Sequence, residues 1–238
     1  MKEVLRTIGL TIGYKGNALM PAIDSVLHEG EAVALVGANG SGKTTLFKTL
    51  TGSLKPIAGK VELCGKPLES YTPNERAKLF SLVLTEKPDD LFLSVFDLVA
   101  AGRYPHSGLM AKLSEADYEM IKLKLQVVGI ENLIYRDFVS LSDGEKQKVM
   151  IAKALVQDTP IVYMDEPSAF LDYPSKVELL QLISRLAAEE HKTILFSSHD
   201  LELLMKHAST MWLVAKGKPM MAGRPEALDV EGYLGVRS

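Results

Sequence analysis

The sequence predicts an α/β fold with a mostly parallel core sheet and a helical subdomain that interrupts it. The run Ala32–Val36 is continuously apolar, which indicates a strand buried on both faces, as in a parallel sheet. A glycine-rich loop and a helix-like segment follow this strand, in the order that phosphate-binding α/β units require. From about residue 88 to residue 134 the pattern is helical instead, over a stretch too long for a plain connection.

Several further runs have the length and composition of strands. The expected strands are Val4–Ile12, Met20–Leu27, Ala32–Val36, Val61–Leu63, Leu79–Leu84, Ile161–Asp165, Thr193–Ser197 and Met211–Ala215. A turn at Gly13 and Gly16 separates the first two. We find no internal repeat, low-complexity tract or long linker, so the strands belong to one unit.

Helix signals stand between these strands. Thr45–Leu50 should be helical and end at Gly52, because glycine readily adopts the left-handed conformation that closes a helix. Capping signatures at Thr72, Ser94 and Ser114 predict three further helix starts. Another helix is marked by a core-facing apolar stripe at helical spacing. Its members, after Pro174, are Val177, Leu180, Ile183 and Ala187.

The glycine loop Gly37–Thr44 fits the phosphate-binding pattern G-x-x-x-x-G-K-[ST]. Its glycines let the backbone fold around a triphosphate, so that N–H groups and the helix N-terminus point at negative oxygens. Lys43 would neutralise the β- and γ-phosphates, and the hydroxyl of Thr44 would ligate Mg²⁺. A flexible loop that matches by chance is the alternative, but it leaves the flanking strand and helix unexplained. We expect a nucleoside triphosphate to bind Gly37, Ala38, Asn39, Gly40, Ser41, Gly42, Lys43, Thr44 and Thr45.

Composition narrows the class of protein. The chain has 238 residues, 47% of them apolar, which is enough for one large core or a core with a subdomain. Its 27 basic and 30 acidic residues give a net charge of −3, so we expect no nucleic-acid partner. The single Cys64 excludes an internal disulfide and suits a reducing compartment. No apolar run approaches the ~18 residues of a membrane span, and Met1–Met20 does not resemble a signal peptide, so we expect a soluble, cytoplasmic protein.

Two carboxylates follow the apolar run at Ile161. Asp165 at the carboxyl end of a parallel strand can hold Mg²⁺ beside the phosphates. Glu166 projects differently and could orient and deprotonate a water for in-line attack on the γ-phosphate. The alternative is an ordinary Asp-Glu turn after a buried strand. Together with the glycine loop, the pair favours nucleotide hydrolysis.

A third element begins at Leu141 and reads Leu-Ser-Asp-Gly-Glu. Here the chain resembles the ATP-binding subunits of ABC transporters, whose signature is Leu-Ser-Gly-Gly-Gln/Glu at the start of a helix. The resemblance extends over essentially the whole chain. Tyr14 matches the aromatic residue that stacks on adenine, and Ser168–Asp172 resembles the D-loop. His199, which follows a strand, matches the switch histidine.

The resemblance implies an ABC-type ATPase fold, in which an antiparallel N-terminal β-subdomain joins the parallel core. It also implies that two copies sandwich two ATP molecules with Mg²⁺, head to tail, as a homodimer. Ser142, Gly144 and Glu145 would then meet the nucleotide held by the other copy, and His199 would contact the γ-phosphate. For Ser142 a plain helix cap is compatible with this role. For His199 and Tyr14 the alternatives are an ordinary histidine after a strand and an ordinary strand tyrosine.

The chain departs from the family pattern at two positions. Glu86 stands where the Q-loop usually carries Gln; a carboxylate can still ligate Mg²⁺ but adds negative charge near the phosphates. Asp143 replaces the first signature glycine, and we expect its side chain to point away from the γ-phosphate, which would repel it. Neither change removes a group that the chemistry requires.

The segment Val95–Gly108 resembles subunits that serve importers of iron–siderophores, haem and cobalamin. Its specific part is Gly-Arg-x-Pro-His; the alternative is a helix C-cap at Gly102 followed by a turn at Pro105. The resemblance implies integral membrane permease subunits as partners, contacted through Glu86–Leu93, with an extracytoplasmic substrate-binding protein acting indirectly. The chain would then lie peripherally on the inner face of the cell membrane.

Other classes stay open at this point. One is a non-transport ABC ATPase, for instance of iron–sulfur cluster assembly or of the DNA-repair type, although the long coiled-coil insertions of the latter are absent. Another is a regulatory nucleotide-binding module without productive hydrolysis, which Glu166 and His199 argue against. We expect a single domain, in which residues 1–86 and 150–238 form the core with its β-subdomain and residues from about 87 to 149 form the helical subdomain.

Overall fold

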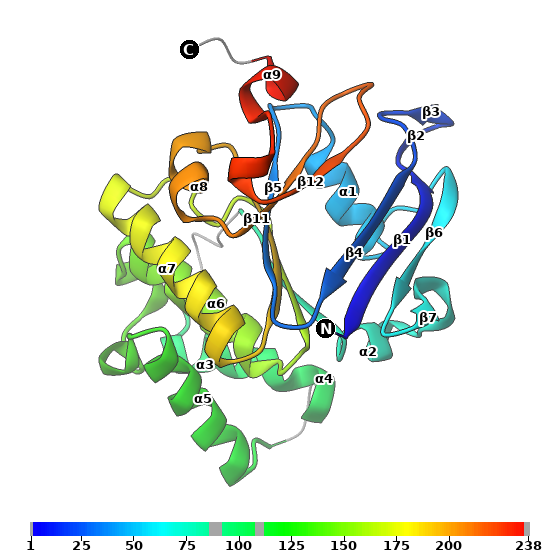
Figure 1. Cartoon of the computed structure of the whole chain (residues 1–238). Coiled ribbons are helices and arrows are strands. Elements are labelled where there is room, and N and C mark those ends of the chain that lie inside the picture. The colour runs from blue at the N-terminus through cyan, green and yellow to red at the C-terminus, as the bar shows by residue number, and fades with distance from the viewer. Residues whose placement is uncertain (1, 86–91, 108–111, 236–238) are drawn as a thin grey trace.

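A six-stranded sheet forms the central layer of the computed structural model, which describes residues 2–85, 92–107 and 112–235 (Figure 1). The strand order is β12-β11-β5-β10-β9-β8. The strands are β5 (Ala32–Val36), β8 (Phe80–Val83), β9 (Ile161–Met164), β10 (Thr193–Ser198), β11 (Thr210–Leu213) and β12 (Met221–Gly223). All neighbours are parallel except β12, which pairs antiparallel with β11. Every residue of β9 and β10 is buried, as continuous apolar strands require.

A second sheet, formed mainly by the N-terminal part of the chain, is antiparallel with the order β4-β1-β6-β7. Its strands are β1 (Glu3–Thr11), β4 (Ile23–His28), β6 (Ala58–Leu63) and β7 (Lys66–Pro67), while β2 (Gly13–Tyr14) and β3 (Asn17–Ala18) form a short hairpin. At Gly59 a Cβ atom would lie 2.2 Å from the carbonyl oxygen of Gly9, so this pairing of β6 with β1 has no room for a side chain. The predicted α/β class with an antiparallel N-terminal sheet is confirmed.

Helices fill the space around the two sheets. The helices are α1 (Lys43–Leu50), α2 (Pro73–Arg76), α3 (Val95–Ala100), α4 (Tyr104–Ser107), α5 (Glu115–Val127), α6 (Asp143–Val156), α7 (Tyr173–Glu189), α8 (Leu201–His207) and α9 (Val230–Leu234). Five short 3₁₀ turns are described as well: Leu68–Ser70, Ala101–Arg103, Glu131–Leu133, Phe138–Ser140 and Pro225–Ala227. Within the described ranges, none of the helices combines the length and apolar character that a membrane crossing requires.

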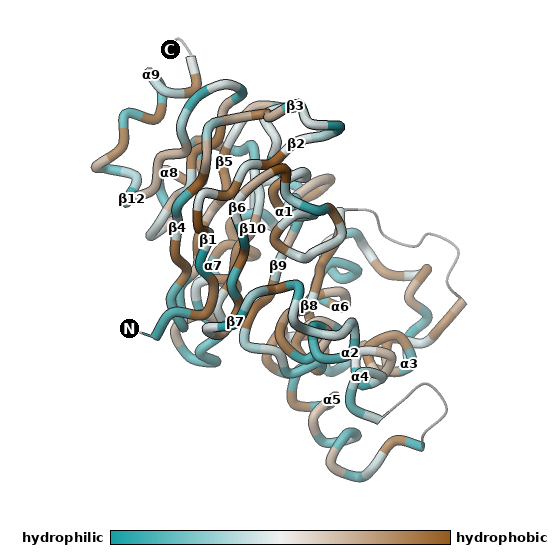
Figure 2. Tube along the Cα trace, turned by 90° about the vertical axis from the view of Figure 1, so that its right-hand side faces the viewer, coloured by the Kyte–Doolittle hydropathy of each residue, from teal (hydrophilic) through white to brown (hydrophobic). Residues whose placement is uncertain are grey.

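Two apolar cores lie on opposite faces of the central sheet. One fills the space between the two sheets and encloses α1, with Leu46, Leu50 and Trp212 fully or almost fully buried. The other packs α3, α5, α6, α7 and α8 against the opposite face of the central sheet. In Figure 2 the strands of both sheets carry long hydrophobic stretches, as this layering requires. The boundary expected near residue 149 falls inside α6, so the division into core and helical subdomain stays a prediction.

Several helix starts follow the predicted caps. Thr72 forms a capping box with Glu75, in which each side chain accepts a hydrogen bond from the other residue's backbone N–H. Ser114 begins α5 with a capping box as well, and Ser94 begins α3 by accepting a bond from the N–H of Asp97. The predicted stripe of α7 also faces the core: Leu180, Ile183 and Ala187 are buried and Val177 is half-buried.

The structure around Gly102 differs from the alternative considered from the sequence, a helix C-cap at Gly102 followed by a turn at Pro105. Helix α3 ends at Ala100, and the chain continues through the 3₁₀ turn Ala101–Arg103 into α4, which contains Pro105. A C-cap at Gly102 and a turn at Pro105 are therefore both wrong. The reason is packing: a Cβ atom on Gly102 would lie 2.3 Å from the carbonyl oxygen of Lys153 in α6. The glycine serves a close approach of two helices and not a left-handed turn.

Arg103 and His106 fasten this region to the end of α6. The Arg103 guanidinium donates from Nε to Oδ1 of Asp117 at 2.7 Å and from Nη1 to the carbonyl oxygen of Val156 at 2.7 Å. His106 Nε2 lies 2.8 Å from the carbonyl oxygen of Gln157. The last carbonyls of a helix have no partner within it, so these side chains satisfy acceptors that α6 leaves open.

Asp117 holds Arg103 in place and is itself held by the cap of α5. The hydroxyl of Ser114, its backbone N–H and Arg103 all donate to the carboxylate, which lowers the pKa of Asp117 to about 2. Because the folded chain favours the charged form, Asp117 stabilises the fold above its unfolded pKa of about 4. This contribution is lost as the pH falls from about 4 towards 2.

Replacement of Arg103 by Ala should lower the free energy of unfolding by about 3 kcal/mol, because it removes charged hydrogen bonds to the Asp117 carboxylate and to the Val156 carbonyl. Lys122→Ala is the matched control, since it removes an exposed ion pair to Glu119 on the same helix and should cost at most about 0.5 kcal/mol. Urea unfolding of the two variants measures the difference. Equal costs would show that the Arg103 contact does not stabilise the helical region.

Candidate nucleotide-binding site

The glycine loop lies between β5 and α1, at the carboxyl edge of the central sheet. Gly40 and Gly42 have φ values of 77° and 109°, which side chains rarely adopt. Gly42 is the N-cap of α1 and offers no side-chain cap, so the first N–H groups of the helix stay open to a ligand. The hydroxyl of Ser41 is buried and lacks a hydrogen-bond partner among the described residues. An anion seated in the loop would supply partners for these donors.

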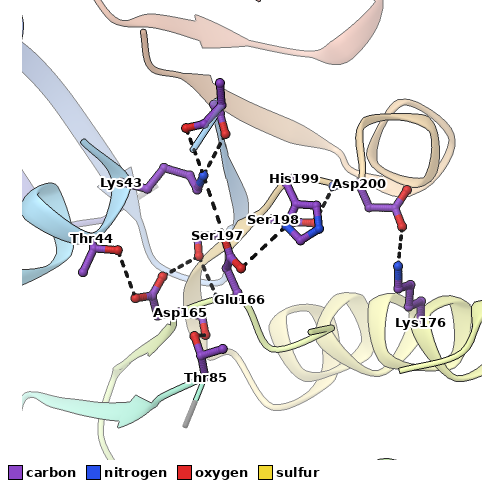
Figure 3. Close-up of polar contacts among 12 residues, drawn as sticks. Lys43, Thr44, Thr85, Asp165, Glu166, Lys176, Ser197, Ser198, His199 and Asp200 are labelled. Carbon is purple, nitrogen blue, oxygen red and sulfur yellow. Dashed lines mark hydrogen bonds and ion pairs between the residues drawn. The ribbon is translucent and has the colours of Figure 1, made fainter. Parts of the chain in front are cut away.

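Lys43 reaches back over the loop and is only 6% exposed. Its ammonium donates to the carbonyl oxygen of Gly37 at 2.7 Å and to that of Ala38 at 3.4 Å. It also lies 3.7 Å from Oε1 of Glu166, as Figure 3 shows. The loop thus holds a buried cation at its centre, which is the charge that a polyphosphate requires.

The two predicted carboxylates follow β9 and face the loop (Figure 3). Oδ2 of Asp165 accepts a long hydrogen bond of 3.5 Å from the Thr44 hydroxyl. Oε2 of Glu166 lies 3.6 Å from Nδ1 of His199, which follows β10. The structure therefore brings together the residues that the sequence assigned to metal binding and hydrolysis: Lys43, Thr44, Asp165, Glu166 and His199.

The donors at this site fit Mg²⁺. The ion prefers hard oxygen ligands and is usually held by one or two carboxylates together with substrate phosphates. Thr44 and Asp165 offer one hydroxyl and one carboxylate side by side. Among the described residues there is no cluster of three or more His, Cys, Asp or Glu that could hold a metal without help. Glu86, the third predicted ligand, lies outside the described residues.

A cavity of about 300 Å³ lies beside the loop. It is lined by Tyr14, Leu19, Asn39, Gly40, Gly42, Lys43, Thr44, Thr45 and Glu166. The Tyr14 ring is half exposed, and its hydroxyl accepts a hydrogen bond of 3.4 Å from Thr45. The aromatic side chain thus stands at the cavity, and its stacking on adenine stays a prediction. Leu19 was not predicted, because a leucine after a short hairpin carries no sign of a binding role until the hairpin is placed.

The signature residues occupy a different place. Ser142 is the N-cap of α6 and forms a capping box with Glu145, whose carboxylate accepts bonds from the backbone N–H and the hydroxyl of Ser142. These two bonds, the backbone bond first, lower the pKa of Glu145. Ser142, Gly144 and Glu145 line a second cavity of about 240 Å³ between α6 and α7. None of the three lines the cavity at the glycine loop. One copy of the chain therefore does not bring the signature to its own phosphate loop.

The segment predicted to be the D-loop joins β9 to α7. Phe170 is 80% exposed and has a φ of 66°, a left-handed conformation that is strained for a bulky side chain. Asp172 ends the segment as the N-cap of α7 and accepts a hydrogen bond from the N–H of Ser175.

Comparison with known proteins identifies the family. The family model described as ABC transporter matches residues 21–169. The chain is 38% identical to the ABC transporter ATP-binding protein MJ0873 of Methanocaldococcus jannaschii, over 94% of this chain and 77% of that protein. It is 33% identical to the ferric enterobactin transport ATP-binding protein FepC of Escherichia coli, over 94% of this chain and 83% of that protein. The chain therefore belongs to the ABC transporter family.

Solved structures agree on the fold. CbiO1 of Clostridium perfringens, part of the ABC transporter complex cbiONQ, superposes with a TM-score of 0.86 at 27% identity, over 98% of this chain and 93% of that one. The ADP form of MJ1267, an ATP-binding cassette of an ABC transporter, gives 0.86 at 23% identity over 99% and 96% of the two chains. Within the family this chain is the ATP-binding subunit, an ABC-type ATPase, as the sequence resemblance predicted.

Replacement of Lys43 by Ala should weaken ATP binding by about 10- to 100-fold, the range expected when a charged hydrogen-bond donor is removed. Lys48→Ala is the matched control, because Lys48 lies on the exposed face of the same helix and should leave affinity unchanged. Calorimetric titration with ATP measures both variants. Unchanged affinity in Lys43→Ala would remove the lysine from the phosphate site.

Proposed function

We propose that this ATPase powers an importer of iron–siderophores or of a related metal chelate, such as haem or cobalamin. Relatives named for siderophore transport support the proposal, and their match over nearly the whole chain carries it. The achromobactin transport ATP-binding protein CbrD of Dickeya dadantii is 36% identical over 92% of this chain and 82% of that protein. FepC, named for ferric enterobactin transport, aligns over a similar share. The Gly102–His106 element adds support, since it resembles that subfamily.

The site geometry supports a division of labour in hydrolysis. The loop and Lys43 would bind the β- and γ-phosphates, while Thr44 and Asp165 would hold Mg²⁺. When bound, Mg²⁺ would neutralise charge on the phosphates. Glu166 would orient the attacking water and take its proton, and His199 would contact the γ-phosphate.

The ion pair between Lys43 and Glu166 suggests how binding prepares the site. Their charged groups lie 3.7 Å apart, so each partly compensates the other. A triphosphate carries more negative charge than one carboxylate and would draw the Lys43 ammonium to itself. Glu166 would then lose its cation and become available to a water molecule. Binding of substrate would in this way release the general base.

The position of the signature supports a dimer. Ser142 is exposed at the start of the 14-residue helix α6, away from the loop of its own chain. A helix N-terminus attracts anions, so a second copy in head-to-tail orientation would place it against the γ-phosphate. We propose that two copies close on two ATP molecules, and that hydrolysis reopens them. Permease subunits in the membrane would convert this movement into transport, and a substrate-binding protein outside would deliver the cargo.

Replacement of Glu166 by Gln should lower turnover by about 10²- to 10⁴-fold, because the amide cannot take a proton from water. ATP binding should survive, so the variant should accumulate as a nucleotide-bound dimer. Phosphate release and light scattering measure the two effects. Glu202→Gln, on the exposed face of α8, is the control and should behave as wild type. Hydrolysis retained in Glu166→Gln would exclude the residue as the base.

Ser142→Ala should abolish the ATP-dependent dimer when made in the Glu166→Gln background. Ser114→Ala is a matched control, since both serines cap helices in the same type of box. Each substitution should cost about 1 kcal/mol of stability through the lost cap. Light scattering with and without ATP separates them, because only Ser142 is proposed to touch nucleotide. Equal dimer formation by the two variants would contradict the proposed contact between Ser142 and the nucleotide of the other copy.

Deletion of this chain from its host should abolish uptake of one member of a panel of ferric siderophores, haem and cobalamin. Wild-type chain should restore uptake, and Glu166→Gln should not, because transport depends on turnover. Co-purification with a polytopic membrane protein would support transport. Association with soluble partners alone, together with unchanged uptake, would favour a non-transport ABC ATPase, such as one of iron–sulfur cluster assembly.

A further inference from the structure

Two hydroxyl groups form hydrogen bonds with Asp165 and Glu166, the residue pair that follows β9. Ser197 on β10 donates to Oδ1 of Asp165 at 2.7 Å and accepts the backbone N–H of Glu166 at 2.7 Å (Figure 3). From the other side, Thr85 donates to the carbonyl oxygen of Asp165 at 2.7 Å. Strand β9 lies between β10 and β8 in the sheet, so the two hydroxyls reach it from its two neighbours.

The Ser197 hydroxyl both donates and accepts a hydrogen bond at this site. The residue is fully buried, and its oxygen uses its one proton on Asp165 and a lone pair on Glu166. Loss of this hydroxyl would leave one oxygen of the Asp165 carboxylate and the backbone N–H of Glu166 without this hydrogen bond. Unpaired polar groups are rare inside proteins because they destabilise the fold.

These bonds orient the Asp165 carboxylate and hold the backbone of Glu166. With Oδ1 of Asp165 held by Ser197, the second oxygen faces the Thr44 hydroxyl at 3.5 Å. Glu166 has a φ of 46°, a left-handed conformation that persists only where neighbouring groups hold it. Its N–H bond to Ser197 does so, and leaves the Glu166 carboxylate between the side chains of Lys43 and His199.

We propose that Ser197 and Thr85 form a hydroxyl clamp that positions Asp165 for Mg²⁺ and Glu166 for water. The clamp rests on the proposed roles of those two carboxylates. Ser197 stands two residues before His199, and Thr85 directly precedes Glu86. The clamp therefore joins the ends of three strands that each lead to a predicted nucleotide contact.

The test compares variants of the full chain that lose or keep a hydroxyl. Ser197→Ala and Thr85→Val lose it, whereas Ser197→Thr and Thr85→Ser keep it. Ser81→Ala is the control: Ser81 is equally buried in the same sheet and accepts a bond from Thr159, but it lies away from the nucleotide end. The measurements are ATP affinity with Mg²⁺ and with EDTA, kcat and KM for MgATP, and the melting temperature.

Ser197→Ala and Thr85→Val should each lower kcat by about 10- to 100-fold, as expected when a partner that orients a metal ligand is removed. Affinity for ATP should fall by about 10-fold with Mg²⁺ but change less than about twofold with EDTA, since Lys43 and the loop are untouched. Ser197→Thr and Thr85→Ser should retain wild-type kcat. Ser81→Ala should lower the melting temperature and leave kcat unchanged.

A folded Ser197→Ala variant with wild-type kcat and Mg²⁺-dependent affinity would overturn the clamp. If Ser197→Ala does not fold, the nearly isosteric Thr85→Val decides in the same way. If turnover of the isolated chain is too slow to measure, the Mg²⁺-dependent part of the affinity decides instead. A wild-type chain that binds no MgATP would overturn the nucleotide site itself, whereas failure of the clamp leaves wild-type binding and the loss of turnover in Glu166→Gln intact.

Discussion

The parallel pairing of β5, β10 and β9 is the constraint on which the site depends. Parallel strands end at the same edge of a sheet, so the loop after Val36, the carboxylates after Met164 and the histidine after Ser198 meet there. The hydrogen bonds of the sheet fix this meeting, and burial on both faces keeps the strands in register. The position of the candidate site thus depends on apolar strands that have no chemical role in it.

At the carboxyl edge of the central sheet, each charged side chain of the site has a partner in the structure. Lys43 is buried among loop carbonyls and one carboxylate, so the cation is compensated before any nucleotide arrives. The Asp165 carboxylate and carbonyl and the backbone N–H of Glu166 are in turn held by hydroxyls, whereas the Glu166 carboxylate faces Lys43 and His199. A neutral donor orients the Asp165 carboxylate without cancelling its charge, which would leave that charge available to the proposed Mg²⁺.

Helix α6 connects the helical region to the proposed interface between two copies. Its first turn carries Ser142 in a capping box, and its last carbonyls accept bonds from Arg103 and His106. Gly102 lets the 3₁₀ turn approach the same helix closely. The Gly102–His106 element, which resembles one subfamily, thus packs against the carboxyl end of α6 and hydrogen-bonds to it.

Local sequence determined the glycine loop, the capped helix starts, the buried strands and the family, because each depends on neighbouring residues and on spacing along the chain. It did not determine what Gly102 does, since its role depends on Lys153 in another helix. Nor did it mark Ser197 and Thr85, because a hydroxyl on or beside a strand is ordinary until the adjacent strand is known. Only the tertiary structure decided these roles, since each is a contact between segments far apart in the chain.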